Sequence, residues 1–169
     1  MKFFSANIES LRELYDNQIR SLLSTEEQIT EALPKMIEKA TDPELKQAFQ
    51  THLKETQNHV TRLEQILSER GGKVDSIKCK STAALISGAE DLVKDAKDES
   101  VRDAVLIAGA QRIEHFEIAS YGTVRNWARI LGENRQAQLL DQTVKEEGNA
   151  DHILTSIANR VNPYAEKAA

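Results

Sequence analysis

The sequence has few of the residues that cross-link a chain or reverse its direction. Cys79 is the single cysteine, so no disulfide can form within the chain, and this is compatible with a reducing compartment. Only 3 prolines and 7 glycines occur in 169 residues, and aromatic residues make up 5%. A sandwich of many short strands needs more turn-forming residues than this, so we expect an all-α fold.

Long hydrophobic runs and an excess of positive charge are also missing. No stretch approaches the roughly 18 apolar residues of a membrane span. The 22 basic residues are outnumbered by 27 acidic ones, which argues against a phosphate-binding surface. We therefore expect a cytoplasmic protein that binds neither membranes nor nucleic acid. The length fits a single domain, residues 1–169, with a short polar tail from about residue 163.

Apolar residues recur at three- and four-residue steps in four long segments, which predicts four amphipathic helices. We expect the first helix at about 6–40, with a kink at Pro34, and the second from Pro43 to Gly71. The third should run from Ser100 to Leu131, where Ser100 and Asp103 form a capping box. The fourth should run from Asn134 to Val161 and end before Asn162 and Pro163. A connector at 73–98 with a short helix at 83–93 joins the two pairs. This layout predicts a ferritin-like four-helix bundle with a long crossover connector.

Each of the four predicted helices carries acidic residues on its apolar face. At about 100° per residue, Glu26 and Glu147 lie near the middle of their stripes, whereas Glu27 and Glu146 point away. Glu114, Glu117 and Asp151 complete the set on the third and fourth helices. One such glutamate is commonly a rim residue that reaches water, but a carboxylate on every helix favours a shared site.

The second helix adds histidines to this pattern. His52 and His59 lie near the middle of its apolar face, and Glu55 is adjacent to both. A lone buried histidine is commonly a hydrogen-bonded core residue, but here each has a carboxylate three or four residues away. Buried carboxylates must be neutralised by protonation, by a cation or by a metal, and lysine and arginine are nearly absent from these faces.

Inward carboxylates with nearby histidines predict a centre of two metal ions, iron or alternatively manganese. The candidate ligands are Glu26, His52, Glu55, His59, Glu114, Glu117, Glu147 and Asp151. Tyr121, one turn after Glu117, either donates a hydrogen bond to a ligand or is oxidised by a reactive centre; the alternative is a core tyrosine whose hydroxyl bonds a backbone carbonyl.

Three segments, HLKETQNHVTRLEQIL at 52–67, VRDAVLIAGAQRIEHFEIASYGT at 101–123 and LLDQTVKEEGNAD at 139–151, resemble the YciE/YciF-like stress proteins of the ferritin-like superfamily. The resemblance implies a bacterial stress-response homodimer with a rubrerythrin-like two-metal site. Carried over by position, the implied ligands are the candidates above except His59, which stands where the family leads us to expect glutamine. His59 is then an extra ligand or a donor to one. Asn58 and Ala150 occupy the places of the histidines in the usual Glu-x-x-His spacing.

Two hypotheses follow for the function. In the first, a di-iron centre acts as an oxidoreductase on peroxide or Fe(II), with oxygen or peroxide as oxidant and an external reductant, because no cysteine cluster is present. In the second, the protein is a structural or partner-binding dimer with a degenerate metal site. The candidate dimer surface is the small-residue side of the third helix, which contains Ala104, Ala108, Gln111, His115, Ala119 and Gly122.

Overall fold

The computed structural model describes residues 8–71 and 73–167, and within these ranges it contains five helices and no strand. The helices are α1 (Leu11–Lys39), α2 (Pro43–Glu69), α3 (Lys80–Asp95), α4 (Glu99–Ile130) and α5 (Asn134–Ala165). In the described part of the chain, no helix is long and apolar enough to cross a bilayer.

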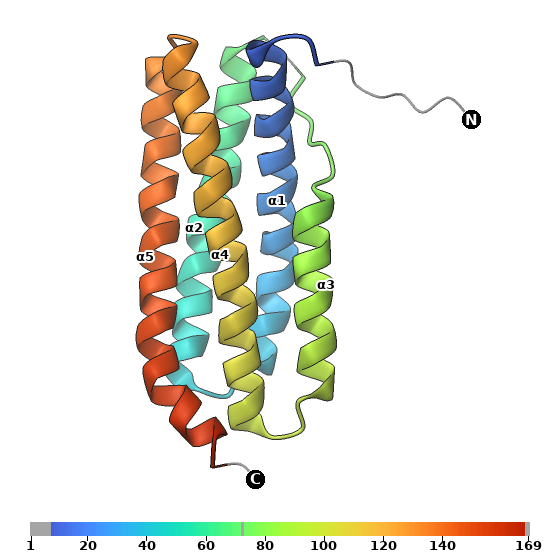
Figure 1. Cartoon of the computed structure of the whole chain (residues 1–169), viewed down its shortest axis with the longest axis vertical. Coiled ribbons are helices and arrows are strands. Elements are labelled where there is room, and N and C mark those ends of the chain that lie inside the picture. Colours follow the sequence, from blue (N-terminus) through green and yellow to red (C-terminus); the bar gives the residue numbers. More distant parts are fainter. Residues whose placement is uncertain (1–7, 72, 168–169) are drawn as a thin grey trace, which may run out of the picture.

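The four long helices form a bundle whose helix pairs are α1 with α2 and α4 with α5 (Figure 1). The two pairs lie side by side as a four-helix square, because α1 also packs against α4, and α2 against α5. Chain direction alternates within each pair, and α2 and α4 run in the same direction (Figure 1). A long connection from the end of α2 to the start of α4 produces this order, which confirms the predicted ferritin-like bundle.

The crossover segment lies along α1 before it forms α3. The backbone N–H of Ile77 donates to the carbonyl of Arg20 over 3.0 Å, and the N–H of Cys79 donates to the Ser24 hydroxyl over 3.2 Å. Helix α3 then packs on α4 and α1 outside the four-helix square. The predicted helix at 83–93 is therefore present but longer at both ends, and the unpaired Cys79 precedes it as its N-terminal flanking residue.

Several helix ends differ from the sequence-based prediction. Helix α1 begins at Leu11 with Ser10 as its N-cap, so Ile8 is 43% exposed rather than part of the core, and residues 6 and 7 lie outside the described residues. Helix α5 continues through Pro163 to Ala165, because a proline in the last turn removes only one hydrogen bond.

The predicted capping box at the start of α4 is wrong. Asp98 is the N-cap, and its side chain accepts from the backbone N–H groups of Ser100 and Val101. Asp103 is instead buried and accepts from the N–H of Thr41 and of Asp42, each over 2.8 Å, and from the Thr41 hydroxyl over 2.6 Å. Its carboxylate therefore fixes the turn between α1 and α2 to α4.

Buried apolar residues form two clusters at opposite ends of the bundle. One cluster uses residues in 15–23, 63–67, 121–128 and 137–140, and the other uses residues in 29–40, 45–49, 106–113 and 154–161. The gap between the two clusters falls at the same level on all four long helices. Buried polar residues fill it, namely Glu26, His52, Thr56, His59, Glu114, Glu117, Thr143 and Glu147.

Candidate metal centre

Six of the eight predicted ligand residues meet in this polar layer, where their side chains form two overlapping groups. The first group contains His52, Glu114, Glu117 and Glu147, and the second contains Glu26, His59 and Glu147. Within each group, one ligand atom per residue lies within 4.8 Å of the others. Glu147 belongs to both groups, so the arrangement suits two ions that share one carboxylate.

Helix α2 supplies one histidine to each group. His52 and His59 are seven residues apart, which is two helical turns, and both side chains point into the bundle. The Nε2 atom of His52 lies 3.2 Å from Glu114 Oε1, and the Nδ1 atom of His59 lies 2.9 Å from Glu147 Oε1 and 3.5 Å from Glu26 Oε1. The structure thus places both histidines among the carboxylates.

Most of the potential ligand atoms are buried without a hydrogen-bond partner. Within the described residues, nine of the twelve such side-chain atoms belong to these six residues. Both oxygens of Glu117 and both oxygens of Glu147 are among them, since the contact between His59 Nδ1 and Glu147 Oε1 is an ion pair without hydrogen-bond geometry. Buried polar atoms are normally paired, so this concentration at one level of the bundle indicates that the side chains are arranged for a ligand other than protein.

A second carboxylate orients His59 from outside the two groups. The sequence predicts that Glu146 points away, but its Oε2 atom lies 2.8 Å from His59 Nε2. Arg62 Nη2 donates to Glu146 Oε1 over 3.0 Å. When Nε2 of His59 carries the proton shared with Glu146, the Nδ1 lone pair faces the centre, which is how such carboxylates usually orient a histidine ligand.

The Tyr121 hydroxyl makes a hydrogen bond to a candidate ligand residue and not to a backbone carbonyl. It donates to Glu26 Oε1, and the side chain is fully buried. Burial together with the nearby charges of Glu26 and Glu117 raises the pKa of Tyr121 well above its ordinary value. The phenol therefore stays protonated and holds the Glu26 carboxylate in place as a hydrogen-bond donor.

The two remaining candidates lie outside both groups. Glu55 is half-buried, and its Oε2 atom lies 3.8 Å from His52 Nδ1 on the side away from Glu114. Asp151 accepts from Gln111 over 3.1 Å and lies 3.3 Å from Nε2 of the exposed His115. Gln111 and His115 are thereby in contact with α5, although the sequence assigns both to the candidate dimer surface.

The buried charges in the centre shift several pKa values. Burial alone disfavours charged histidine, but Glu114 and Glu55 raise the pKa of His52 to about 9, and Glu147 and Glu26 raise that of His59 to about 11. Burial raises the pKa of Glu117 well above its ordinary range, and the charges of Glu26 and Glu147 add to this. Protons therefore neutralise the metal-free centre.

The donor set fits two divalent cations. With both histidines neutral, the four carboxylates of Glu26, Glu114, Glu117 and Glu147 balance the charge of two such ions. Oxygen donors with one imidazole for each ion suit iron and manganese, and no thiolate is present in either group. Metal binding would also satisfy the unpaired ligand atoms. The residues present therefore fit the predicted dinuclear site.

The sequence of this chain is similar to that of a known protein family. Residues 10–166, nearly the whole chain, match the family described as a domain of unknown function, DUF892. The protein YciF of Escherichia coli strain K12 is 38% identical over 165 residues, which cover 96% of this chain and 99% of that protein. This chain belongs to the YciF-like DUF892 family. The resemblance drawn from its three sequence segments is thereby confirmed.

Solved structures of similar proteins have the same fold as this chain. The crystal structure of the E. coli stress protein YciF has a TM-score of 0.88 and 36% identity, and the match covers 92% of this chain and 99% of that one. YcfI of Rhodopseudomonas palustris, described as a candidate structural protein, has a TM-score of 0.87 and 38% identity, with 90% and 98% coverage. A protein of Xanthomonas campestris pv. campestris shares the fold alone, at 21% identity, a TM-score of 0.74, and coverage of 93% and 97%.

Sequence reasoning missed Glu146 because a helical wheel describes one helix at a time. Considered on α5 alone, Glu146 lies away from the apolar face. In the bundle, the same side chain faces the adjacent helix α2. The available signal was Arg62, a cation near the apolar face of α2 that needs a carboxylate partner.

Proposed function

We propose that this member of the YciF-like family is a cytoplasmic bacterial stress-response protein that holds two ions of iron, or alternatively manganese. His52, Glu114, Glu117 and Glu147 would hold one ion, and Glu26, His59 and Glu147 the other. The single observation that carries this proposal is the set of unpaired, buried ligand atoms at one level of the bundle. The description of E. coli YciF as a stress protein supports the cellular role.

We propose further that the loaded protein is an oxidoreductase on Fe(II) or peroxide. The chemistry that two redox-active ions would supply here, if bound, is the donation of electrons to a small oxidant such as oxygen or peroxide. The chain contributes a site shielded from bulk water, since Glu26, Glu117, Glu147 and His59 have no exposed surface. Tyr121 and Glu146 fix the orientation of Glu26 and His59, so the donor atoms are held in place before the ions bind.

Metal analysis is the first test of this proposal. Protein purified without chelator and supplied with Fe(II) or Mn(II) should hold close to two ions per chain. Glu26→Ala should lower this content, whereas Glu27→Ala should not, because Glu27 is exposed beside the centre. Fewer than about one ion per wild-type chain would contradict the dinuclear proposal.

Stopped-flow absorbance tests the oxidoreductase proposal separately. The Fe(II)-loaded protein is mixed with oxygen and, in a second series, with peroxide, and the near-ultraviolet band of ferric ions is followed. Faster growth with oxygen supports Fe(II) oxidation, and faster growth with peroxide supports a peroxidase-like activity. If neither oxidant reacts faster than with free Fe(II), the enzymatic part of the proposal is wrong and metal binding alone remains.

The description of YcfI as a candidate structural protein favours a second function. In that case the chain is a structural or partner-binding protein whose centre holds one ion or none. A homodimer fits both functions, and light scattering should report twice the chain mass of 18.9 kDa. A mass near 18.9 kDa, or that of a large shell, would contradict the dimer.

A further inference from the structure

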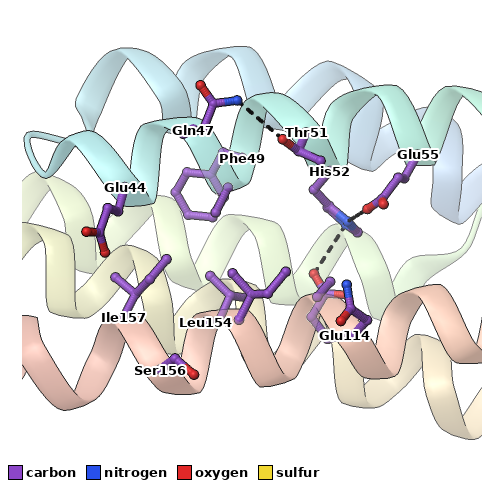
Figure 2. Close-up of a pocket in the computed structure, with 14 residues that line it drawn as sticks. Glu44, Gln47, Phe49, Thr51, His52, Glu55, Glu114, Leu154, Ser156 and Ile157 are labelled. Atoms are coloured by element: carbon purple, nitrogen blue, oxygen red, sulfur yellow. Dashed lines mark hydrogen bonds and ion pairs between the residues drawn. The ribbon is translucent and has the colours of Figure 1, made fainter.

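A pocket between α2 and α5 opens directly onto one half of the centre. Its volume is about 460 Å³, and His52 and Glu114 lie at its inner end (Figure 2). The rest of its wall includes Phe49, Ala150 and Leu154. None of the residues of the second group, Glu26, His59 and Glu147, lines this pocket. The two halves of the centre are therefore unequally accessible from outside.

The charged residues of this pocket are mostly of one sign. Glu44, Glu55 and Glu114 line it together with His52, and no lysine or arginine does. Arg160 already pairs with Glu44 at the outer end, which leaves Glu55 as the half-buried carboxylate nearest the centre. When His52 is neutral, a cavity with this lining attracts cations and repels anions, and it accelerates the arrival of a cation.

His52 lies between the pocket and the centre. Its Nδ1 atom lies 3.8 Å from Glu55 Oε2 in the pocket, and its Nε2 atom lies 3.2 Å from Glu114 Oε1 in the centre (Figure 2). The residue is 7% exposed, and neither nitrogen has a hydrogen-bond partner. A nearly buried imidazole that makes no hydrogen bond and lies between an acidic pocket and the carboxylates of the centre points to a cationic ligand that passes it.

We propose that the α2–α5 pocket is the route by which divalent cations reach the centre, with Glu55 as the carboxylate that first receives them. This proposal rests on the proposed function, because it assumes a centre that binds metal. It gives Glu55 a transient role in place of the resident-ligand role that the sequence predicts. It also identifies a hydrated divalent cation, rather than an anion, as the species that the pocket admits.

Stopped-flow uptake of Co(II) by the metal-free full-length protein tests this route, because Co(II) absorbance changes when the ion leaves water. Glu55→Gln should slow uptake about three- to tenfold without changing the final Co(II) content. The wild-type rate should fall as salt is added, and the variant rate should fall less. Ala48→Phe, which narrows the pocket wall without changing charge, should also slow uptake.

Glu64→Gln is the matched control, because Glu64 is an exposed glutamate on the same helix that does not line the pocket. Wild-type uptake rates in both pocket variants would overturn the route, as would equal slowing by Glu64→Gln. A lower final Co(II) content in Glu55→Gln would also overturn it and make Glu55 a resident ligand. A wild-type protein that binds no Co(II), Fe(II) or Mn(II) at equilibrium would instead refute the proposed function itself.

Discussion

Replacing Glu117 with methionine should stabilise the metal-free protein and weaken metal binding. Glu117 has no exposed surface, and neither of its carboxylate oxygens has a hydrogen-bond partner. Methionine has nearly the same length and shape but carries no group that needs such a partner. In the proposed metal-bound protein, an ion would satisfy this carboxyl group.

The size of the effect follows from the number of unsatisfied groups. One buried carboxyl group without partners costs about 1 to 3 kcal/mol, so Glu117→Met should raise the free energy of unfolding of the metal-free protein by that amount. For a chain of 169 residues this corresponds to a rise in Tm of roughly 3 to 10 °C. Losing a ligand should weaken metal binding at least about tenfold, which is about 1.4 kcal/mol.

Thermal unfolding with EDTA and with excess Mn(II) measures both effects. Glu117→Met should have the higher Tm in EDTA and the smaller increase in Tm when Mn(II) is added. Glu27→Met is the matched control, because Glu27 is exposed on α1 and should change neither quantity appreciably. A lower Tm for Glu117→Met than for wild type in EDTA would show that the carboxyl group is satisfied in the metal-free state, and the reasoning would be refuted.

Three further predictions follow from the surroundings of the centre. Glu146→Gln should weaken Mn(II) binding about 10- to 100-fold, because Glu146 orients His59; titration calorimetry that gives wild-type affinity would exclude this role. The pKa of His52 is raised from 6.5 to about 9, so the stability that His52 contributes to the metal-free protein should be complete below about pH 6.5 and lost as the pH rises toward 9. The affinity for Mn(II) should increase over the same range, because the ion binds the deprotonated imidazole. Urea unfolding at several pH values and calorimetry in two buffers check both, and the absence of proton release on binding would contradict the prediction. Asp103→Ala should lower the free energy of unfolding by about 2 to 4 kcal/mol, because three hydrogen bonds to the α1–α2 turn are lost. The exposed cap variant Asp98→Ala should lower it by only about 1 kcal/mol. Similar urea midpoints in the two variants would show that Asp103 acts only as a surface residue.

The helices and the inward carboxylates could be predicted from the sequence because both are local properties. An apolar period of 3.6 residues fixes which side of a helix is buried, and Glu26, Glu114, Glu117 and Glu147 lie on that side. Pro43, Gly71 and Gly132 mark helix ends through backbone restrictions that need no tertiary contact, and both glycines have positive φ, 68° and 78°.

Which of the inward residues meet was decided by the tertiary structure. The helical pattern places Glu55 and Asp151 near the edges of their apolar faces and does not exclude them as ligands, but Glu55 lies in the pocket and Asp151 contacts Gln111 and His115. The difference depends on how far each helix is rotated and shifted against its neighbours, and periodicity within one helix carries no information about either.

The same reason explains Glu146 and Asp103. Both residues make their important contacts with another helix or turn, to His59 across the α2–α5 interface and to Thr41 at the end of α1. The sequence by itself determined the type of fold and the chemical character of the centre, because carboxylates and histidines on the apolar faces of the helices must be neutralised by protons, by a cation or by a metal once they are buried. Only the packing of the helices decided the division into two ligand groups, the carboxylate behind His59 and the acidic pocket that reaches one group, because each depends on distances between residues far apart in the chain.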